Sequence, residues 1–482
     1  MRAQKVPEVA GEFVDAQLGD ERLTKRLQRI ATSVAIAPSD SFPRVAGTDG
    51  ELEGVYRFFS NARVSLESIL EPHFRATQIR SGDGEILVLH DTTGFAFRGG
   101  GGREGLGRLQ RAAGPQSKQG FFGHFALAMT ADGSRQPLGL LGVRTFVRAE
   151  ESARTSSRRR SMNRERKEAS RWTAQVLAVH SLTPNAIHVM DREADSYENH
   201  RLLLGGGIRF IVRGRIGWNR IGERDGVRDT LPELTAQTPI RLKRAVCVSR
   251  RSPNAVGVLN KVNPPRQERM AKLAVRAASV LLPRPHLFSR RDPDRSSLSL
   301  NVVCVEEIKP PSGVEPISWM LLTNEPVQTR EQIEKIVDAY RGRWTIEEFF
   351  KALKTGCAFE KRQLESLEAL RNALAVFSVV AWRLLLLRSV SRMTPRAPAA
   401  TVASKRQIDL IRALPQLDRR FSKIAVPARP TAADILLAIA KLGGHLKNNG
   451  PPGWQIIGRG YDSLLLLELG WKAHEDREKC DR

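Results

Sequence analysis

Short apolar runs alternate with helical segments along this chain of 482 residues. EILVLHD, NAIHVMD, FIVRGR and WMLLTNEP have the length and the Val, Ile and Leu content of buried strands. FFGHFALAMTADGSRQPLGLLGVRTFV predicts a hairpin, because two apolar runs flank an Ala-Asp-Gly-Ser turn. Strands joined in this way by hairpins and helical crossovers are typical of an α/β fold. The sequence therefore predicts an α/β core.

Changes in this pattern predict three regions, at residues 1–68, 69–370 and 371–482. The first is helical, since LGDERLTKRLQRIATSVA places Leu23, Leu27 and Ile30 on one face at helical spacing. The second holds the strands and a β-rich insertion at about 229–313, where β-like runs stand among Pro and Arg. The third is predominantly helical, with a Pro-rich break near residues 394–400.

The charge balance indicates a polyanionic partner. Lys and Arg number 77 against 52 Asp and Glu, which gives a net charge of +25 and a sequence pI near 10.6. Nucleic acid is the expected partner because neutralised phosphates release counterions. An anionic membrane surface and plain solubility are the alternatives. Arg26 and Arg57, on two N-terminal helices, are candidate phosphate contacts, and a solvated helix surface is the other interpretation.

The sequence favours a cytoplasmic protein with no membrane partner. The most apolar stretch, residues 373–387, is interrupted by Arg383 and is too short to span a bilayer, so we expect a buried core helix. MRAQKVPEVAGEF has no apolar run of signal-peptide length. Four scattered cysteines without a CxxC pair indicate a reducing compartment and no structural zinc.

Two of the apolar runs, EILVLHD and NAIHVMD, end on an aspartate, Asp91 and Asp191. A carboxylate at the C-terminal end of a strand lies on a rigid platform at the rim of a sheet. For either residue alone, a turn or helix-cap role is the alternative.

A third carboxylate, Glu347, lies in a predicted helix that a capping box at Thr329 opens and that runs to about Gly356. Spacing by three and four puts a mixed set of side chains on one face of this helix: Tyr340, Arg343, Trp344, Glu347, Lys351 and Lys354. Simple i,i+4 stabilisation of a surface helix is the alternative, but it does not account for the two aromatic residues. The stripe indicates a metal ligand flanked by phosphate-binding groups.

The three carboxylates fit phosphodiester hydrolysis by two Mg²⁺ ions, with Mn²⁺ able to substitute. One ion activates the attacking water and the other stabilises the leaving oxygen. Mg²⁺ prefers carboxylate oxygens and keeps several waters, so Asp91, Asp191 and Glu347 would suffice as metal ligands and catalytic residues.

These residues resemble a known family. YRGRWTIEEFFKALK matches the Y-x2-R-x3-E-x6-K pattern of bacterial insertion-sequence DDE transposases of the IS-four type, which include the Tn-five transposase. VLHDTT and VMDREAD are similar to the first and second Asp segments of that family. FIVRGR and EPISWMLLTNEPV resemble its neighbouring strands, and similarity extends to LGDERLTKRLQRIA, EGVYRFFSN, AIAKLGG and GPPGW.

The resemblance implies an RNase H-like catalytic core with a β-rich insertion, between an N-terminal helical DNA-binding domain and a C-terminal helical dimerisation region. Such a bacterial, nucleoid-associated protein binds terminal inverted repeats and forms a homodimer in the DNA-bound synaptic complex. The family nicks one strand by water attack, and the new 3′-OH forms a hairpin on the flanking strand. The hairpin is opened, and the 3′ ends are joined to target DNA.

The resemblance also implies roles for single residues. Tyr340, Arg343 and Arg213 would hold a backbone phosphate near a flipped base, and Trp319 would stack upon that base. Lys354 would contact DNA near the scissile end.

Three functions remain open: an active cut-and-paste transposase, a silent descendant that only occupies the repeats, and a stand-alone nuclease of the same fold. The intact acidic triad favours the first. The glycine run at 99–102 is expected to be a flexible loop near the active site and not a P-loop, since no Gly-Lys-Ser/Thr follows. The polar, Arg-rich residues 150–171 are expected to be an exposed loop or helix.

Overall fold

The computed structural model describes residues 6–98, 102–109, 118–147, 170–215, 221–248, 250–251, 264–284, 297–446 and 451–480. Most of the glycine run and residues 150–169 of the Arg-rich segment therefore lie outside the described residues. The chain divides into two units. Unit 1 comprises Met1–Arg154, Ser181–Thr183 and Trp344–Arg482, and unit 2 comprises Thr155–His180 and Pro184–Arg343.

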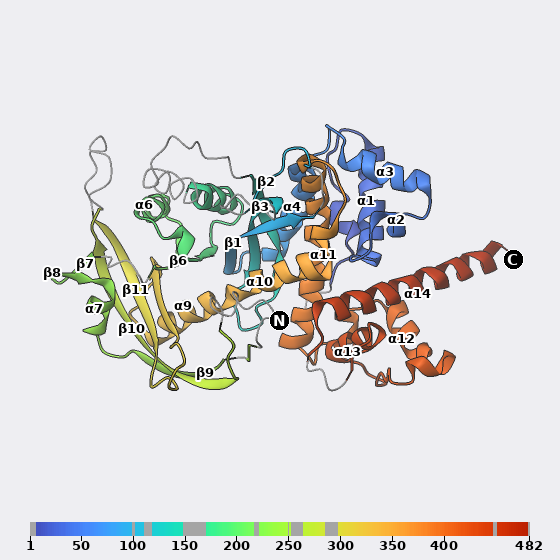
Figure 1. Cartoon of the computed structure of the whole chain (residues 1–482). Coiled ribbons are helices and arrows are strands. Elements are labelled where there is room, and N and C mark those ends of the chain that lie inside the picture. Colours follow the sequence, from blue (N-terminus) through green and yellow to red (C-terminus); the bar gives the residue numbers. More distant parts are fainter. Residues whose placement is uncertain are drawn as a thin grey trace. The chain divides into compact units, whose positions relative to one another are not determined.

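An antiparallel sheet forms the centre of unit 1 (Figure 1). β3 (Gln119–Thr130) pairs along its whole length with β1 (Ile86–Phe97) and on its other side with β4 (Pro137–Phe146) and the short β2 (Gly107–Arg108). The β3–β4 pair confirms the predicted hairpin. β4 passes close to a helix at Gly139, where a Cβ atom would lie 2.0 Å from Thr77 Oγ1, and the φ of 145° there also favours glycine.

Helices surround this sheet within unit 1. They are η1 (Ala10–Phe13), α1 (Glu21–Ile36), α2 (Phe42–Val45), α3 (Asp49–Phe59), α4 (Leu66–Ser81), α10 (Trp344–Lys351), η3 (Ala352–Gly356), η4 (Phe359–Lys361), α11 (Leu367–Met393), η5 (Ala399–Thr401), α12 (Lys405–Leu417), η6 (Arg419–Phe421), α13 (Ala432–Leu442) and α14 (Trp454–Cys480). The predicted N-terminal helix is confirmed as α1, in which Leu27 and Ile30 are buried.

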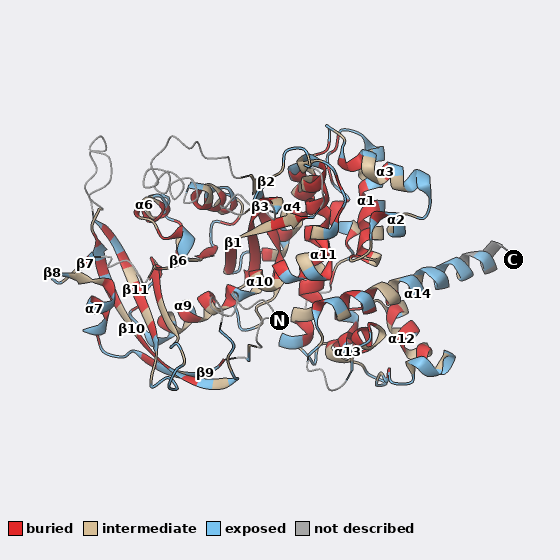
Figure 2. Cartoon of the chain, viewed as in Figure 1, coloured by how far each residue is buried: buried red, intermediate tan, exposed pale blue. Residues whose placement is uncertain are grey.

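The longest apolar helix, α11, is a core helix of unit 1 (Figure 2). By length and composition it could cross a membrane, but 83% of its most apolar window is buried inside the structure. Trp382 anchors it by donating an Nε1–H hydrogen bond to the Pro137 carbonyl at the start of β4. The helix ends at Met393, which confirms the predicted break before the Pro-rich stretch.

Unit 2 is built on a mixed sheet. β5 (Ile187–Met190) and β6 (Arg209–Arg213) are parallel and are connected through η2 (Arg192–Ala194) and α6 (Tyr197–Gly205). β12 (Ser318–Thr323), β11 (Leu298–Glu307) and β10 (Arg269–Leu282) follow as antiparallel neighbours. β10 also pairs with β9 (Leu242–Val248) and β7 (Ile221–Arg224), and β7 forms a hairpin with β8 (Val227–Thr230).

The described residues of the segment predicted as a β-rich insertion, about 229–313, contain the strands β9, β10 and β11 and the short helix α7 (Leu231–Ala236). Side chains from β5, β6, β10, β11 and β12 form a continuous hydrophobic core with those of Trp172, Tyr197 and α7. Alternating buried and exposed residues along β10 and β11 are visible in Figure 2. Exposure on one face is typical of antiparallel strands.

The prediction of one helix up to Gly356 is wrong, although its start is confirmed. α9 (Arg330–Gly342) begins at the Thr329–Gln332 capping box. It ends where Gly342, a weak helix former, precedes Arg343, whose N–H bonds the Tyr340 carbonyl in a tightened turn. Beyond α10 the residues of η3 form a π-helical turn, with the Cys357 N–H bonding the Ala352 carbonyl.

The prediction that a strand ends at Asp91 is also wrong, because β1 continues to Phe97. Thr92, Thr93 and Phe95 favour an extended backbone, and β3 offers pairing partners as far as Gln119. Asp91 therefore lies in the middle of a strand. The same prediction is confirmed for Asp191, which directly follows β5.

Candidate active site

In unit 1, Asp91 is placed by strand pairing with β3. Phe125 is its direct partner, and opposite residues of an antiparallel pair direct their side chains to the same face of the sheet. Asp91 is half-buried, and its Oδ1 accepts a hydrogen bond of 2.8 Å from the Thr92 N–H. The carboxylate is therefore held on a rigid strand at a defined face.

Neighbouring imidazoles occupy the other face of this strand. His90 and Thr92 flank Asp91 and, by strand alternation, direct their side chains away from the face of the carboxylate. Thr92 Oγ1 lies 2.8 Å from His124 Nδ1, and the His90 and His124 rings stack with centroids 5.8 Å apart. These buried groups stabilise the β1–β3 pair and leave the carboxylate face to oxygen ligands.

Glu347 is brought to the same face by aromatic packing. Phe349 and Phe350 follow Glu347 by two and three residues on α10. Their rings contact the Phe125 ring, with centroids 5.4 and 5.5 Å apart. Because Phe125 shares a face with Asp91, α10 covers the face that carries Asp91 (Figure 1). Glu347 is half-buried there. One aromatic cluster thus positions two of the three predicted carboxylates.

Lys354 is also placed beside β1. Its Nζ donates a 2.6 Å hydrogen bond to the Gly94 carbonyl and lies 5.4 Å from the centre of the Phe95 ring. Burial lowers the pKa of this ammonium group, and the nearby Glu360 carboxylate opposes that shift. The π-helical turn that carries Lys354 therefore directs this side chain to β1, the strand that also carries Asp91.

In unit 2, Asp191 lies beside Tyr340 and Arg213. Asp191 follows β5, and Arg213 ends the parallel neighbour β6. Tyr340, from α9, is buried, and its pKa is raised first by burial and then by the negative charge of Asp191. A hydrogen bond from Arg213 and the positive charges of Arg213 and Arg343 act in the opposite direction on that pKa.

Trp319 and Arg343 complete this group of five, which we name the Asp191 cluster. Trp319, on β12, meets the edge of the Tyr340 ring with centroids 5.5 Å apart and planes at 64°. The Arg343 guanidinium carbon lies 6.0 Å from the centre of that ring. The structure therefore brings together five residues that the sequence predicted from separate segments.

The predicted helical stripe is divided between the units, since Tyr340 and Arg343 belong to unit 2 and the remainder to unit 1. Within unit 1, Lys351 Nζ lies 5.1 Å from the centre of the Trp344 ring and forms an ion pair with Glu348. Trp344 and Lys351 thus contact each other at helical spacing.

The chemistry of the carboxylates fits a divalent metal. One oxygen of Asp191, Oδ1, is buried and has no hydrogen-bond partner among the described residues. A buried carboxylate oxygen in this state requires a partner, and Mg²⁺ prefers such hard oxygen ligands. Asp91 and Glu347 belong to unit 1 and Asp191 to unit 2, and the described residues contain no group of three or more His, Cys, Asp or Glu that could hold a metal.

Arg26 and Arg57 lie in the N-terminal helical region. Arg57, on α3, is exposed and pairs with Glu53 one turn earlier. Arg26, on α1, is exposed as well, but its guanidinium covers Gly54 so closely that a Cβ atom there would lie 1.9 Å from a guanidinium nitrogen. Arg26 and Gly54 line a groove of about 290 Å³ between the two helices. The structure gives Arg26 a packing role in addition to its exposed charge.

Comparison with known families identifies two parts of the chain. Residues 9–64 match the family model described as transposase DNA-binding, and residues 163–381 match the one described as transposase DDE domain. Both regions are thus similar to domains of transposases. Asp191 and Glu347 fall inside the DDE match, and Asp91 precedes it. The two domains support a DNA transposase, with DNA as its partner.

Sequence reasoning missed two features of the site. Phe125 was part of a predicted strand, but only the pairing register shows that it faces Asp91. A large arginine-lined cavity in unit 2 contains Arg213 and Trp319 together with Arg250, Arg251 and other residues that were not predicted. The Arg250-Arg251 pair in the sequence was its only local signal.

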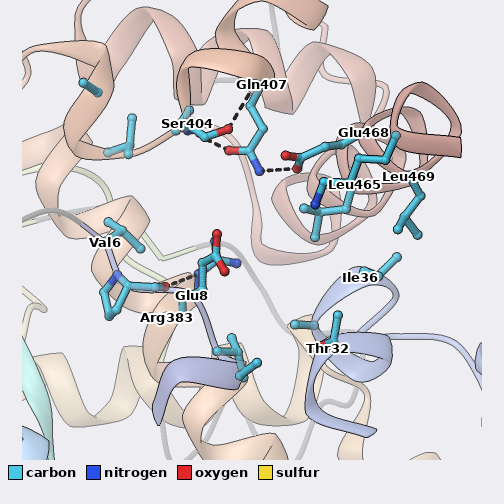
Figure 3. A pocket seen from close by; sticks show the side chains of 18 of the residues that line it. Val6, Glu8, Thr32, Ile36, Arg383, Ser404, Gln407, Leu465, Glu468 and Leu469 are labelled. Atoms are coloured by element: carbon cyan, nitrogen blue, oxygen red, sulfur yellow. Dashed lines mark hydrogen bonds between the residues drawn. The ribbon is translucent and has the colours of Figure 1, made fainter. Parts of the chain in front are cut away.

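A smaller cavity of about 440 Å³ in unit 1 is lined by none of the predicted site residues (Figure 3). Gln407 links α12 to α14 there by donating to Glu468 at 2.8 Å. Arg383 of α11 donates to the Pro7 carbonyl at 2.7 Å. These contacts tie the N-terminal segment and the C-terminal helices together, which is a structural role.

Proposed function

We propose that this protein is a cut-and-paste transposase that cleaves the ends of its element and transfers them to target DNA. The proposal is carried by the Asp191 cluster. There a carboxylate with a buried, unpartnered oxygen lies beside a tyrosine, two arginines and a tryptophan. The matches to transposase DNA-binding and DDE domains support the same conclusion.

In this proposal Asp91, Asp191 and Glu347 act together as the metal ligands. Two Mg²⁺ ions, when bound, would activate the attacking water or 3′-OH and stabilise the leaving oxygen, and Mn²⁺ could replace them. The packing of Phe125 against Phe349 and Phe350 of α10 supports this proposal, because it holds the helix of Glu347 against the strand of Asp91.

The remaining residues of the site would hold the DNA. Arg213 and Arg343 would carry the charge for a backbone phosphate, and both lie close enough to the buried Tyr340 hydroxyl to lower its pKa. Trp319 offers an aromatic surface for a flipped base during hairpin formation. Lys354, already directed to the strand of Asp91, would contact the scissile end.

The proposal extends to the assembly. The N-terminal domain would bind terminal inverted repeats, and the C-terminal helical region would pair two copies in the synaptic complex. Such a protein would act at the nucleoid of a bacterial cytoplasm. We also propose that the catalytic core has an RNase H-like fold.

The test uses purified full-length protein, Mg²⁺ and a duplex bearing the repeats that flank its gene. Wild-type protein should produce nicks and then hairpins at the repeat boundary. Glu347→Gln should lower cleavage by about 10³-fold or more, because the change replaces a proposed metal-ligand carboxylate with a neutral amide. Each tenfold loss of rate corresponds to about 1.4 kcal/mol of lost transition-state stabilisation. Repeat binding should be retained. Glu368→Gln, which removes a surface acid at the start of α11, is the matched control.

Specific binding by the wild-type protein without cleavage, in Mg²⁺ and in Mn²⁺, would instead identify a silent repeat-binding protein. Cleavage without strand transfer would identify a stand-alone nuclease. Full cleavage by the Glu347→Gln variant would remove Glu347 from the metal site.

A further inference from the structure

Arginines are the most frequent residue type in the lining of a large cavity of unit 2. It has a volume of about 1560 Å³ and lies between the end of β9, the segment that leads into β10 and the loop before β12. Arg250, Arg251 and Arg266 line it, together with Arg192 and Arg213, which follow the site strands β5 and β6. Among the described residues of this lining, Glu315 is the one acidic residue. We name this cavity the arginine basin.

Two of these arginines face each other across a backbone bridge. Arg251 and Arg266 exchange two hydrogen bonds, with N···O distances of 2.8 and 3.0 Å, as direct partners of an antiparallel bridge. Directly opposed like charges destabilise such a pair. Accordingly the pKa of Arg266 is lowered, first by burial and then by the positive charges of Arg251 and Arg269. A bound anion would offset this repulsion.

Internal ion pairs neutralise only part of the charge in the basin. Arg269 pairs with Glu307, and Arg341 pairs with Asp338 at 3.0 Å. Among the described residues, neither Arg250 nor Arg251 has a carboxylate partner. Two guanidinium groups that lie within a cavity and outside any internal ion pair favour an external polyanion.

The size and the remaining wall of the basin indicate a polymer. Pockets for small ligands measure about 300–1,000 Å³, and the basin is larger. Trp319 and Arg213 belong both to its wall and to the Asp191 cluster. A ligand in the basin would therefore continue to the carboxylate at which cleavage is proposed.

We propose that the arginine basin binds the sugar–phosphate backbone of the DNA strand that leads to the Asp191 cluster. This inference rests on the proposed transposase function and adds to it a contact surface in the β-rich insertion, with Arg250 and Arg251 as phosphate contacts. The surplus of basic residues in the chain favours DNA over an acidic protein segment as the occupant.

The test measures equilibrium binding of the full-length protein to a labelled duplex without repeats, in EDTA, across salt concentrations. Each lost phosphate contact lowers the slope of log K against log salt by about 0.9, so Arg250→Gln/Arg251→Gln should lower it by about 1.8. Between 50 and 200 mM salt the wild-type protein should then lose about tenfold more affinity than the variant. Arg250→Lys/Arg251→Lys, which keeps both charges, should restore most of the slope.

The matched control is Arg228→Gln/Lys243→Gln, which removes two exposed positive charges of unit 2 outside the basin. An unchanged slope in the basin variant, or an equal loss in the control, overturns the proposal. The proposal is also overturned if the basin variant binds the duplex as the wild-type protein does but binds polyglutamate more weakly. That result would indicate an acidic protein segment as the occupant. The single variant Arg250→Gln, at an exposed position, replaces the double variant if thermal melting shows that the latter is unfolded.

The two proposals fail in different ways. In one outcome, the wild-type protein binds DNA with a steep salt dependence that the basin variant reduces, but the wild-type protein never cleaves repeats. This outcome would refute the transposase proposal and support the proposed role of the arginine basin. Wild-type protein that cleaves repeats, with a basin variant of unchanged salt slope, would refute the basin alone.

Discussion

Two buried histidines, on β5 and α6, should make unit 2 sensitive to acid. His188 lies on β5, three residues before Asp191, and is opposite Phe210 in the β5–β6 pair. His200, on α6, stacks on Phe210 and lies 3.1 Å from Asp195 Oδ1. Burial lowers the pKa of His188 to about 3, assisted by His180, and that of His200 to about 4. Both rings are therefore neutral in the folded protein at pH 5.

The sign of the effect follows from which state binds the proton first. In the unfolded chain both rings have a pKa near 6.5. Below that pH the unfolded state therefore binds protons at these two rings, whereas the folded state keeps both rings neutral. The stability they contribute is complete above pH 6.5 and is lost as the pH falls. At pH 5 each ring costs about 2 kcal/mol, or about 4 kcal/mol for His188 and His200 together. That is a large part of the stability of an ordinary domain.

The assay compares the free energy of unfolding at pH 8 and pH 5, with hydrogen exchange of peptides from β5, α6 and β6 as the local readout. His200→Gln keeps a donor near Asp195 but cannot titrate. It should lose about 2 kcal/mol less than wild type between the two pH values, whatever its stability at pH 8. His474→Gln, at an exposed position on α14, should follow the wild-type curve. An identical pH loss in His200→Gln and wild type would refute the reasoning.

Other variants test separate parts of the structure. Trp319→Ala should impair hairpin formation more than the first nick in strand-resolved assays, and equal losses would refute its proposed base-stacking role. Glu12→Gln should lower the free energy of unfolding, measured by urea melts, by about 3–5 kcal/mol. The change removes a buried carboxylate that accepts hydrogen bonds from Arg80 and contacts His73, and a loss below 1 kcal/mol would contradict this account. Asp462→Asn should raise the melting temperature more at pH 8 than at pH 6. Burial and then the charge of Asp40 raise the pKa of the Asp462 carboxyl to about 8, so the penalty for burying it grows up to that pH, and a gain independent of pH would refute this explanation.

Features determined by local hydrogen bonds could be predicted from the sequence. The Thr329–Gln332 capping box starts α9 as expected, since its two hydrogen bonds join residues three apart. The β3–β4 hairpin and the end of α11 were equally accessible. The strand through Asp91 was predicted too short because its continuation depends on pairing with β3, whose register the local sequence does not reveal.

The candidate site was predicted in composition but not in arrangement. The spacing of Tyr340, Arg343 and Glu347 could be read directly, but the break at Arg343 divides this segment between two units. The role of Phe125 as the anchor of α10 depends on contacts between residues more than 200 positions apart. The opposition of Arg251 and Arg266 likewise depends on a bridge that no sequence period encodes.

In the proposed function, the Asp191 cluster would have to bind both a metal ion and a phosphate. A carboxylate meant for a cation and a guanidinium meant for a phosphate would neutralise each other in a direct ion pair. Tyr340 responds to both groups: Asp191 raises its pKa, while Arg213 donates a hydrogen bond to it and lowers that pKa. Because a neutral hydroxyl lies beside Arg213, and Asp191 has no ion pair among the described residues, the proposed function leaves each charge available for its own ligand. The burial of Tyr340, which keeps its hydroxyl protonated, is therefore part of the proposed chemistry as well as of the packing.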